Sequence, residues 1–163
     1  MKPLAIILVI LCVAALAGVG WLWFSAELTV SGTGCVAADA MDQADAFRGL
    51  ISSVADGSFT GTLFGAAGRE QPEDCVYYTY TLRLRNATFL PARAVELQIS
   101  PMEGDLLQLP ALSRRDLAAR SEGEFQVTLL TSREMHNIRE ITVTWYFWGL
   151  PFSTRITYHH SGA

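Results

Sequence analysis

Residues 75–86 read CVYYTYTLRLRN, and this stretch indicates more about the fold than any other part of the chain. Apolar or aromatic side chains alternate with more polar ones along its whole length. One face would carry Val76, Tyr78, Tyr80, Leu82 and Leu84, and the other Tyr77, Thr79, Thr81, Arg83 and Arg85. Side chains alternate between the two faces of a β-strand with this period of two. The stretch therefore predicts a strand with one buried face.

Similar alternation recurs on both sides of this strand, between short segments rich in turn residues. The connections are too short for the helical crossovers that parallel strands require. We therefore predict a mainly β protein, a β-sandwich of about seven strands. The other strands are expected over residues 27–36, 59–64, 94–100, 124–131, 139–148 and 152–159. Inside the long stretch 101–123 we expect an edge strand over 106–109 and a helical turn over 113–120.

One segment, residues 39–55, changes to helical spacing. Its apolar residues recur every three or four positions, which is typical of an amphipathic helix. Asp39 suits the start of such a helix, and Gly57 suits its end. We predict one helix here, packed over an edge or an end of the sheets.

A second helix is predicted at the N-terminus, where 21 residues without a charge run from Leu4 to Phe24. Such a helix is about 31 Å long, which matches the hydrocarbon core of a bilayer. Lys2 precedes the run, and acidic residues follow it before the next basic one. Positive charge stays on the cytoplasmic side, so the N-terminus should be cytoplasmic. We expect residues 1–25 to be a transmembrane signal-anchor in the cell membrane, and residues 26–163 to be one extracytoplasmic domain.

A cleaved signal peptide is the competing interpretation. Ala15, Leu16 and Ala17 fit the small-x-small pattern of a cleavage site. The apolar run continues beyond them, which favours an uncleaved anchor. If cleavage occurs, the same domain would be a secreted binding domain.

Composition excludes some partners and suggests a disulfide. The chain has 12 basic and 16 acidic residues, a net charge of −4, which argues against a nucleic-acid partner. Cys35 and Cys75 lie outside the apolar run. In an oxidising compartment two such cysteines favour a Cys35–Cys75 disulfide over two unrelated thiols.

The sequence shows no catalytic signature, and we expect no catalytic residue, no cofactor and no metal site. It lacks a Gly-x-Ser-x-Gly motif, a Cys-x-x-Cys motif and a His-Glu-x-x-His motif. Glu96, Glu124 and Glu140 fall on predicted polar faces, where solvation is the ordinary explanation. We therefore expect a binding or structural domain. The alternative is an envelope enzyme acting on glycan or peptide.

One surface is predicted to bind a partner. If strands 75–86 and 139–148 share a sheet, their outward side chains would form an aromatic and arginine patch, a composition common in binding hot spots. The partner would be a protein or a glycan outside the cell. The alternative is that the helix over 39–55 covers these side chains. The predicted patch consists of Tyr77, Arg83, Arg85, Tyr146 and Trp148.

A resemblance adds to this interpretation. The block from Tyr78 to Asn86, followed by a proline turn and the alternating segment from Val95 to Ile99, resembles the central strands of immunoglobulin-like domains on bacterial single-pass membrane-anchored proteins. The resemblance implies an immunoglobulin-like sandwich with a role in adhesion, envelope assembly or spacing. The chain departs from antibody domains, because no Trp lies between Cys35 and Cys75.

Overall fold

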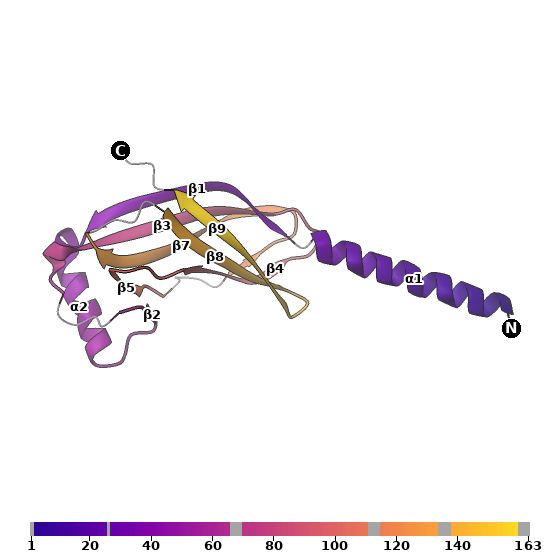
Figure 1. Cartoon of the computed structure of the whole chain (residues 1–163), viewed down its shortest axis with the longest axis horizontal. Helices are drawn as coiled ribbons and strands as arrows, with labels where there is room; N and C mark the ends of the chain where they lie inside the picture. The colour runs from indigo at the N-terminus through magenta and orange to yellow at the C-terminus, as the bar shows by residue number, and fades with distance from the viewer. Residues whose placement is uncertain (1, 26, 66–69, 111–114, 134–137, 160–163) are drawn as a thin grey trace.

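A computed structural model describes residues 2–25, 27–65, 70–110, 115–133 and 138–159. The described strands form two antiparallel sheets, and a long helix projects from one end of them (Figure 1). The five-stranded sheet has the order β1-β3-β7-β5-β2, and the four-stranded sheet has the order β6-β4-β8-β9. The elements are α1 (Lys2–Ser25), β1 (Leu28–Asp39), a 3₁₀ turn (Met41–Gln43), α2 (Ala44–Ala55), β2 (Thr62–Leu63), a second 3₁₀ turn (Pro72–Asp74), β3 (Cys75–Asn86), β4 (Ala92–Ile99), β5 (Asp105–Gln108), β6 (Arg115–Leu117), β7 (Ser121–Ser132), β8 (Ile138–Phe147) and β9 (Leu150–His159).

The main core lies between the two sheets. Strand β3 pairs with β1 on one side and with β7 on the other, and its even-numbered side chains from Tyr78 to Leu84 are buried. Strand β8 supplies the facing odd-numbered set, which includes Ile141 and Trp145. The predicted mainly β fold with two packed layers is therefore confirmed, and strand β3 has the predicted bounds.

A second, smaller core lies on the outer face of the five-stranded sheet, under α2. It joins Phe47 of the helix to Tyr77 and Cys75 of β3 and to Leu107 and Leu130 of the neighbouring strands. The helix ends at Ala55 and is followed by Asp56 and Gly57; Gly57 has φ 75°, a conformation that favours glycine. The predicted helix is confirmed, but it begins later, because Asp39 belongs to β1 and its carboxylate accepts a hydrogen bond from the Met41 N–H at 3.0 Å.

The loops between strands gather at two opposite ends (Figure 1). We call one end the α1 end. It contains residues 86–92, residues 118–121 and the β8–β9 turn at Trp148 and Gly149, and α1 projects from the same end of the sheets. The α2 end lies opposite and contains the start of β3 and the end of β7, beside α2.

Two local predictions were wrong. Residues 115–117 form strand β6, paired with β4, where a helical turn was expected. Strand β5 overlaps the predicted edge segment, 106–109, but lies between β7 and β2, so it is not at the edge. The tertiary partners decide both cases, because short segments have weak intrinsic preferences.

Candidate functional site

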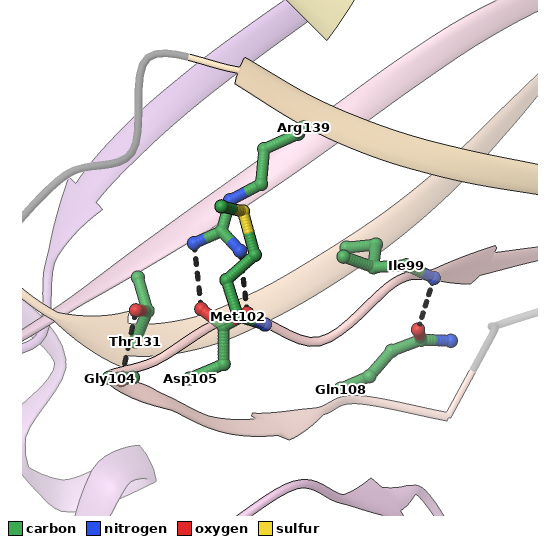
Figure 2. A network of polar contacts seen from close by, with 7 residues as sticks. All are labelled: Ile99, Met102, Gly104, Asp105, Gln108, Thr131 and Arg139. Carbon is green, nitrogen blue, oxygen red and sulfur yellow. Dashed lines mark hydrogen bonds and ion pairs between the residues drawn. The ribbon is translucent and has the colours of Figure 1, made fainter. Parts of the chain in front are cut away.

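A buried ion pair connects the two sheets. Arg139 of β8 donates hydrogen bonds to both carboxylate oxygens of Asp105 in β5, at 2.5 and 2.7 Å (Figure 2). Their side chains are 3% and 0% exposed. Asp105 also accepts a hydrogen bond from the Met102 N–H at 2.7 Å. Each charge is held by its partner away from solvent, so this pair is suited to holding the sheets together and not to contacting a ligand.

Gln108 makes a second connection between the sheets (Figure 2). Its side-chain oxygen accepts a hydrogen bond from the Ile99 N–H at 2.9 Å, and its amide nitrogen donates to the Leu97 carbonyl at 3.2 Å. Strand β6 pairs with β4 only at Ala92 and Val95, so it does not reach these backbone groups. Gln108 takes the place of a neighbouring strand there and satisfies polar groups that would otherwise be buried without partners.

The sequence held a signal for one member of this network. Arg139 has the same odd-numbered register as Ile141, Val143 and Trp145, which marks an inward-facing charge. An inward charge requires a buried partner. Nothing in the alternation identified Asp105 as that partner, because it lies in a separate strand of the other sheet.

The predicted aromatic and arginine patch does not form. Strand β3 lies in the five-stranded sheet and β8 in the four-stranded sheet, so their outward faces are on opposite sides of the sandwich. Arg83 is exposed and pairs with Glu124 at 2.6 Å, and Arg85 approaches Glu122 at 4.0 Å. These are cross-strand pairs between β3 and β7 on a solvated face, an arrangement of small energetic value.

Tyr77 is covered by α2 and is only 7% exposed. For this residue the alternative, a side chain buried under the helix, is the correct one. Beside α2 a groove of about 560 Å³ remains open over the outer face of the sheet. We call it the α2 groove; it is lined by Ala38, Gln43, Ala46, Gly49, Leu50, Tyr77, Thr79, Leu109 and Thr128.

Tyr146 and Trp148 lie at the α1 end. Tyr146 is on β8, opposite Arg93 and Pro151, and is partly exposed. Trp148 is not on a strand face, because it occupies the first position of the two-residue β8–β9 turn, between Phe147 and Leu150. Its side chain is 65% exposed. The strict alternation that we extended to Trp148 ends one residue earlier.

The predicted Cys35–Cys75 disulfide is absent, and both thiols are free. Cys35 pairs with Tyr80, whereas Cys75 lies opposite Ala40, whose N–H donates to its carbonyl at 3.3 Å. Five residue steps separate Cys35 from Ala40, so the cysteines lie about 17 Å apart along the strands. A disulfide requires Cα atoms within about 7 Å. Their side chains also lie on opposite faces, since Cys35 packs on the main core and Cys75 belongs to the core under α2.

A second pocket, of about 380 Å³, lies on the other side of α2. Glu70, Glu73 and Arg48 supply its charged side chains, and Phe47 and Ile51 contribute apolar surface. Within the described residues, no three His, Cys, Asp or Glu side chains are arranged to hold a metal ion.

The fold and these surfaces define a two-sheet β domain joined to an apolar N-terminal helix. No model of a known protein family matches the sequence, and no curated protein matches it. Among solved structures, the GAE domain of yeast GGA1 is similar, with a TM-score of 0.38 and 13% sequence identity. The similarity covers 56% of this chain and 95% of that one.

Proposed function

We propose that the chain is a membrane-tethered, immunoglobulin-like domain that binds a partner outside the cytoplasm and has no catalytic activity. The main support for this proposal is the apolar, unburied helix α1. Over Pro3–Trp21 the helix is long and apolar enough to cross a bilayer, and none of that span is buried against the protein. Exposing so many Leu, Ile and Val side chains to water would cost roughly 1.5–3 kcal/mol each. A lipid environment removes this cost.

The strand order supports the immunoglobulin-like assignment. A constant-type immunoglobulin domain has strands A, B, E and D in one sheet and C, F and G in the other. Strands β1, β3, β7 and β5 follow the first order, and β4, β8 and β9 follow the second. The short strands β2 and β6 are then additions at the free edges of the two sheets.

The tether can be tested with a C-terminal tag on the full chain. In intact cells or spheroplasts, added protease should remove the tag if residues 26–163 are extracytoplasmic. Full protection of the tag would contradict the proposed orientation. Mass analysis of the mature chain distinguishes an uncleaved anchor from a cleaved signal peptide. A chain that begins at Gly18 would be a secreted domain, whereas an intact chain would be anchored.

We assign partner binding to the α2 groove, which lies toward the end of the domain away from α1. Its walls include Leu50 and Leu109, and its one aromatic residue, Tyr77, is buried. Sugars bind by stacking on exposed aromatic faces. An apolar side chain of a protein partner therefore fits the groove better than a glycan does.

Gly49 offers a direct test of this assignment, because a Cβ atom added there meets no atom within 4 Å. A photocrosslinking residue at Gly49 in the native cell should capture a partner that the same residue at exposed Ser52 of α2 does not. Gly49→Gln should fill the groove and reduce crosslinking from a neighbouring groove position, while Ser52→Gln should not. Equal products from both positions would contradict the assignment, and glycan-only products would favour a sugar ligand.

The enzyme alternative rests on the second pocket, which is lined by two carboxylates, a guanidinium and apolar surface. Carboxylate pairs carry out glycoside hydrolysis. Hydrolysis of envelope glycan or peptide by the full chain, lost in both Glu70→Gln and Glu73→Gln, would support an enzyme over a binding domain.

A further inference from the structure

The exposed aromatic side chains of the domain are gathered at one end. From residue 27 onward every Phe, Tyr and Trp is among the described residues, and only Phe89, Tyr146 and Trp148 are more than a third exposed. All three lie at the α1 end, and exposed Leu150 adjoins Trp148. Scattered exposed apolar residues need no explanation, but a set confined to one end indicates a surface that something covers.

Trp148 occupies its position against local preference. Trp148 and Gly149 have φ 51° and 80°, the pattern of a type I′ turn. Asn-Gly is the favoured pair in that turn, and a positive φ is unfavourable for a bulky residue. The turn therefore carries a large, exposed ring where a small polar residue would fold better. Backbone outliers of this kind often accompany a function.

The loop that carries Phe89 is held in place by Asn86, which is fully buried. The Asn86 amide donates to the Leu90 carbonyl at 2.7 Å and to the Ala118 carbonyl at 3.1 Å. Its side-chain oxygen accepts hydrogen bonds from the N–H and hydroxyl of Thr88, at 3.0 and 2.8 Å. Phe89 is 51% exposed on this fixed loop. The aromatic residue is therefore presented outward by a rigid support.

The same end is joined closely to α1. Only residues 26 and 27 lie between Ser25, the last residue of α1, and Leu28, the first of β1. Leu28 pairs with Asn86, so it lies beside the loop that carries Phe89. Three peptide steps span about 10 Å at most. If α1 crosses a membrane, this end of the domain lies at the level of the lipid headgroups.

We infer that the α1 end of the domain docks on the lipid bilayer, with Trp148 and Phe89 in the membrane interface; this rests on the proposed tether. The amphipathic ring of Trp favours that interface, and Phe side chains are buried at the boundary between headgroups and acyl chains. Charges of both signs balance at this end: Arg85 pairs with Glu122 and Arg93 with Asp116, and exposed Glu27 and Arg120 carry opposite charges. Phosphatidylcholine, which carries no net charge, is therefore sufficient for docking. The contact sets the tilt of the domain and directs the α2 end away from the membrane.

The test uses the full chain reconstituted in phosphatidylcholine vesicles. The substitutions Trp21→Phe and Trp23→Phe remove the tryptophan fluorescence of α1. The remaining fluorescence comes from Trp148 and buried Trp145. The contribution of Trp145 is measured in a variant that also carries Trp148→Asn, and it is subtracted. Brominated phosphatidylcholine should quench Trp148, and aqueous acrylamide should quench it less than in detergent. Ile138→Trp in the Trp148→Asn background is the control, because Ile138 is exposed at the far end of the same strand, about 30 Å away. It should show the opposite behaviour.

A second reporter makes the test independent of the turn. Phe89→Trp in the Trp148→Asn background should also be quenched by brominated lipid. Trp148→Asn should keep or raise the melting temperature, because Asn-Gly suits the turn. A chain that does not float with the vesicles would overturn the tether and the docking together. The docking alone would be overturned if the chain floats but acrylamide still quenches both tryptophan reporters, native Trp148 and the Phe89→Trp substitution. Protection only in native membranes would indicate a protein cover and would also overturn it.

Discussion

Arg139 and Asp105 belong to different sheets, yet their charged groups meet through two hydrogen bonds out of contact with water. Asp105→Asn should leave the guanidinium of Arg139 buried without its counter-charge. We expect this variant to lose about 3–5 kcal/mol in the free energy of unfolding, measured by urea unfolding in detergent. The double variant Asp105→Leu, Arg139→Met should recover most of the loss. Arg83→Met, which breaks an exposed pair, should cost within about 1 kcal/mol.

Two glycines near α2 should respond in opposite directions to alanine. Gly49 lies inside the helix with open space at its Cβ position, so Gly49→Ala should stabilise the domain by about 0.5–1 kcal/mol. Gly57 has φ 75°, a conformation that disfavours alanine. Gly57→Ala should therefore destabilise by about 1 kcal/mol. Equal melting temperatures for the two variants would show that backbone conformation does not control these positions.

Asp39 should make the domain sensitive to acid. Hydrogen bonds from the Arg133 guanidinium, at 2.7 and 2.8 Å, and then from the Met41 N–H hold the pKa of its carboxyl below the ordinary value of 3.8. The stabilisation is thus complete well above pH 3.8 and is lost as the pH falls through the folded-state pKa. Compared with Asp39→Asn, the native chain should melt at a higher temperature at neutral pH. The difference should shrink steadily below about pH 4. A constant difference over this range would contradict the assignment.

Cys35 and Cys75 should behave as unreactive thiols. Burial raises the pKa of each thiol to about 11, and the carboxylates of Glu70 and Asp74 add to the shift at Cys75. Because the thiolate is the reactive form, alkylation of the folded chain at neutral pH should be slow at both positions. Denaturant should accelerate it. Mass analysis without reductant should find no peptide linked through Cys35 and Cys75. Reductant should leave the melting temperature unchanged. A Cys35–Cys75 peptide would contradict the register of β1 and β3.

The elements themselves could be predicted from local patterns. Burial of one face imposes a period on the sequence of each element. That period is two in residues 75–86 and 139–148, and three to four in residues 39–55. The strands of the main core and helix α2 were found for this reason. The apolar run that begins at Leu4 was likewise sufficient to predict α1. Such patterns depend only on neighbours along the chain.

The arrangement of the candidate sites depends on contacts between distant segments, which no local period records. Alternation predicted an outward face for β3 and for β8, but it could not show that the two strands lie in different sheets. Because they do, the residues of the predicted patch, from Tyr77 to Trp148, are separated. It also could not show that β8 ends at Phe147, so Trp148 lies in the β8–β9 turn and not on a strand face. The register of β1 against β3 kept Cys35 and Cys75 apart, and the packing of the two sheets brought Arg139 to Asp105. The sequence by itself determined which segments are strands and helices, because burial leaves a local period; only the tertiary structure decided which side chains meet, because strand pairing and sheet packing join residues far apart in the chain.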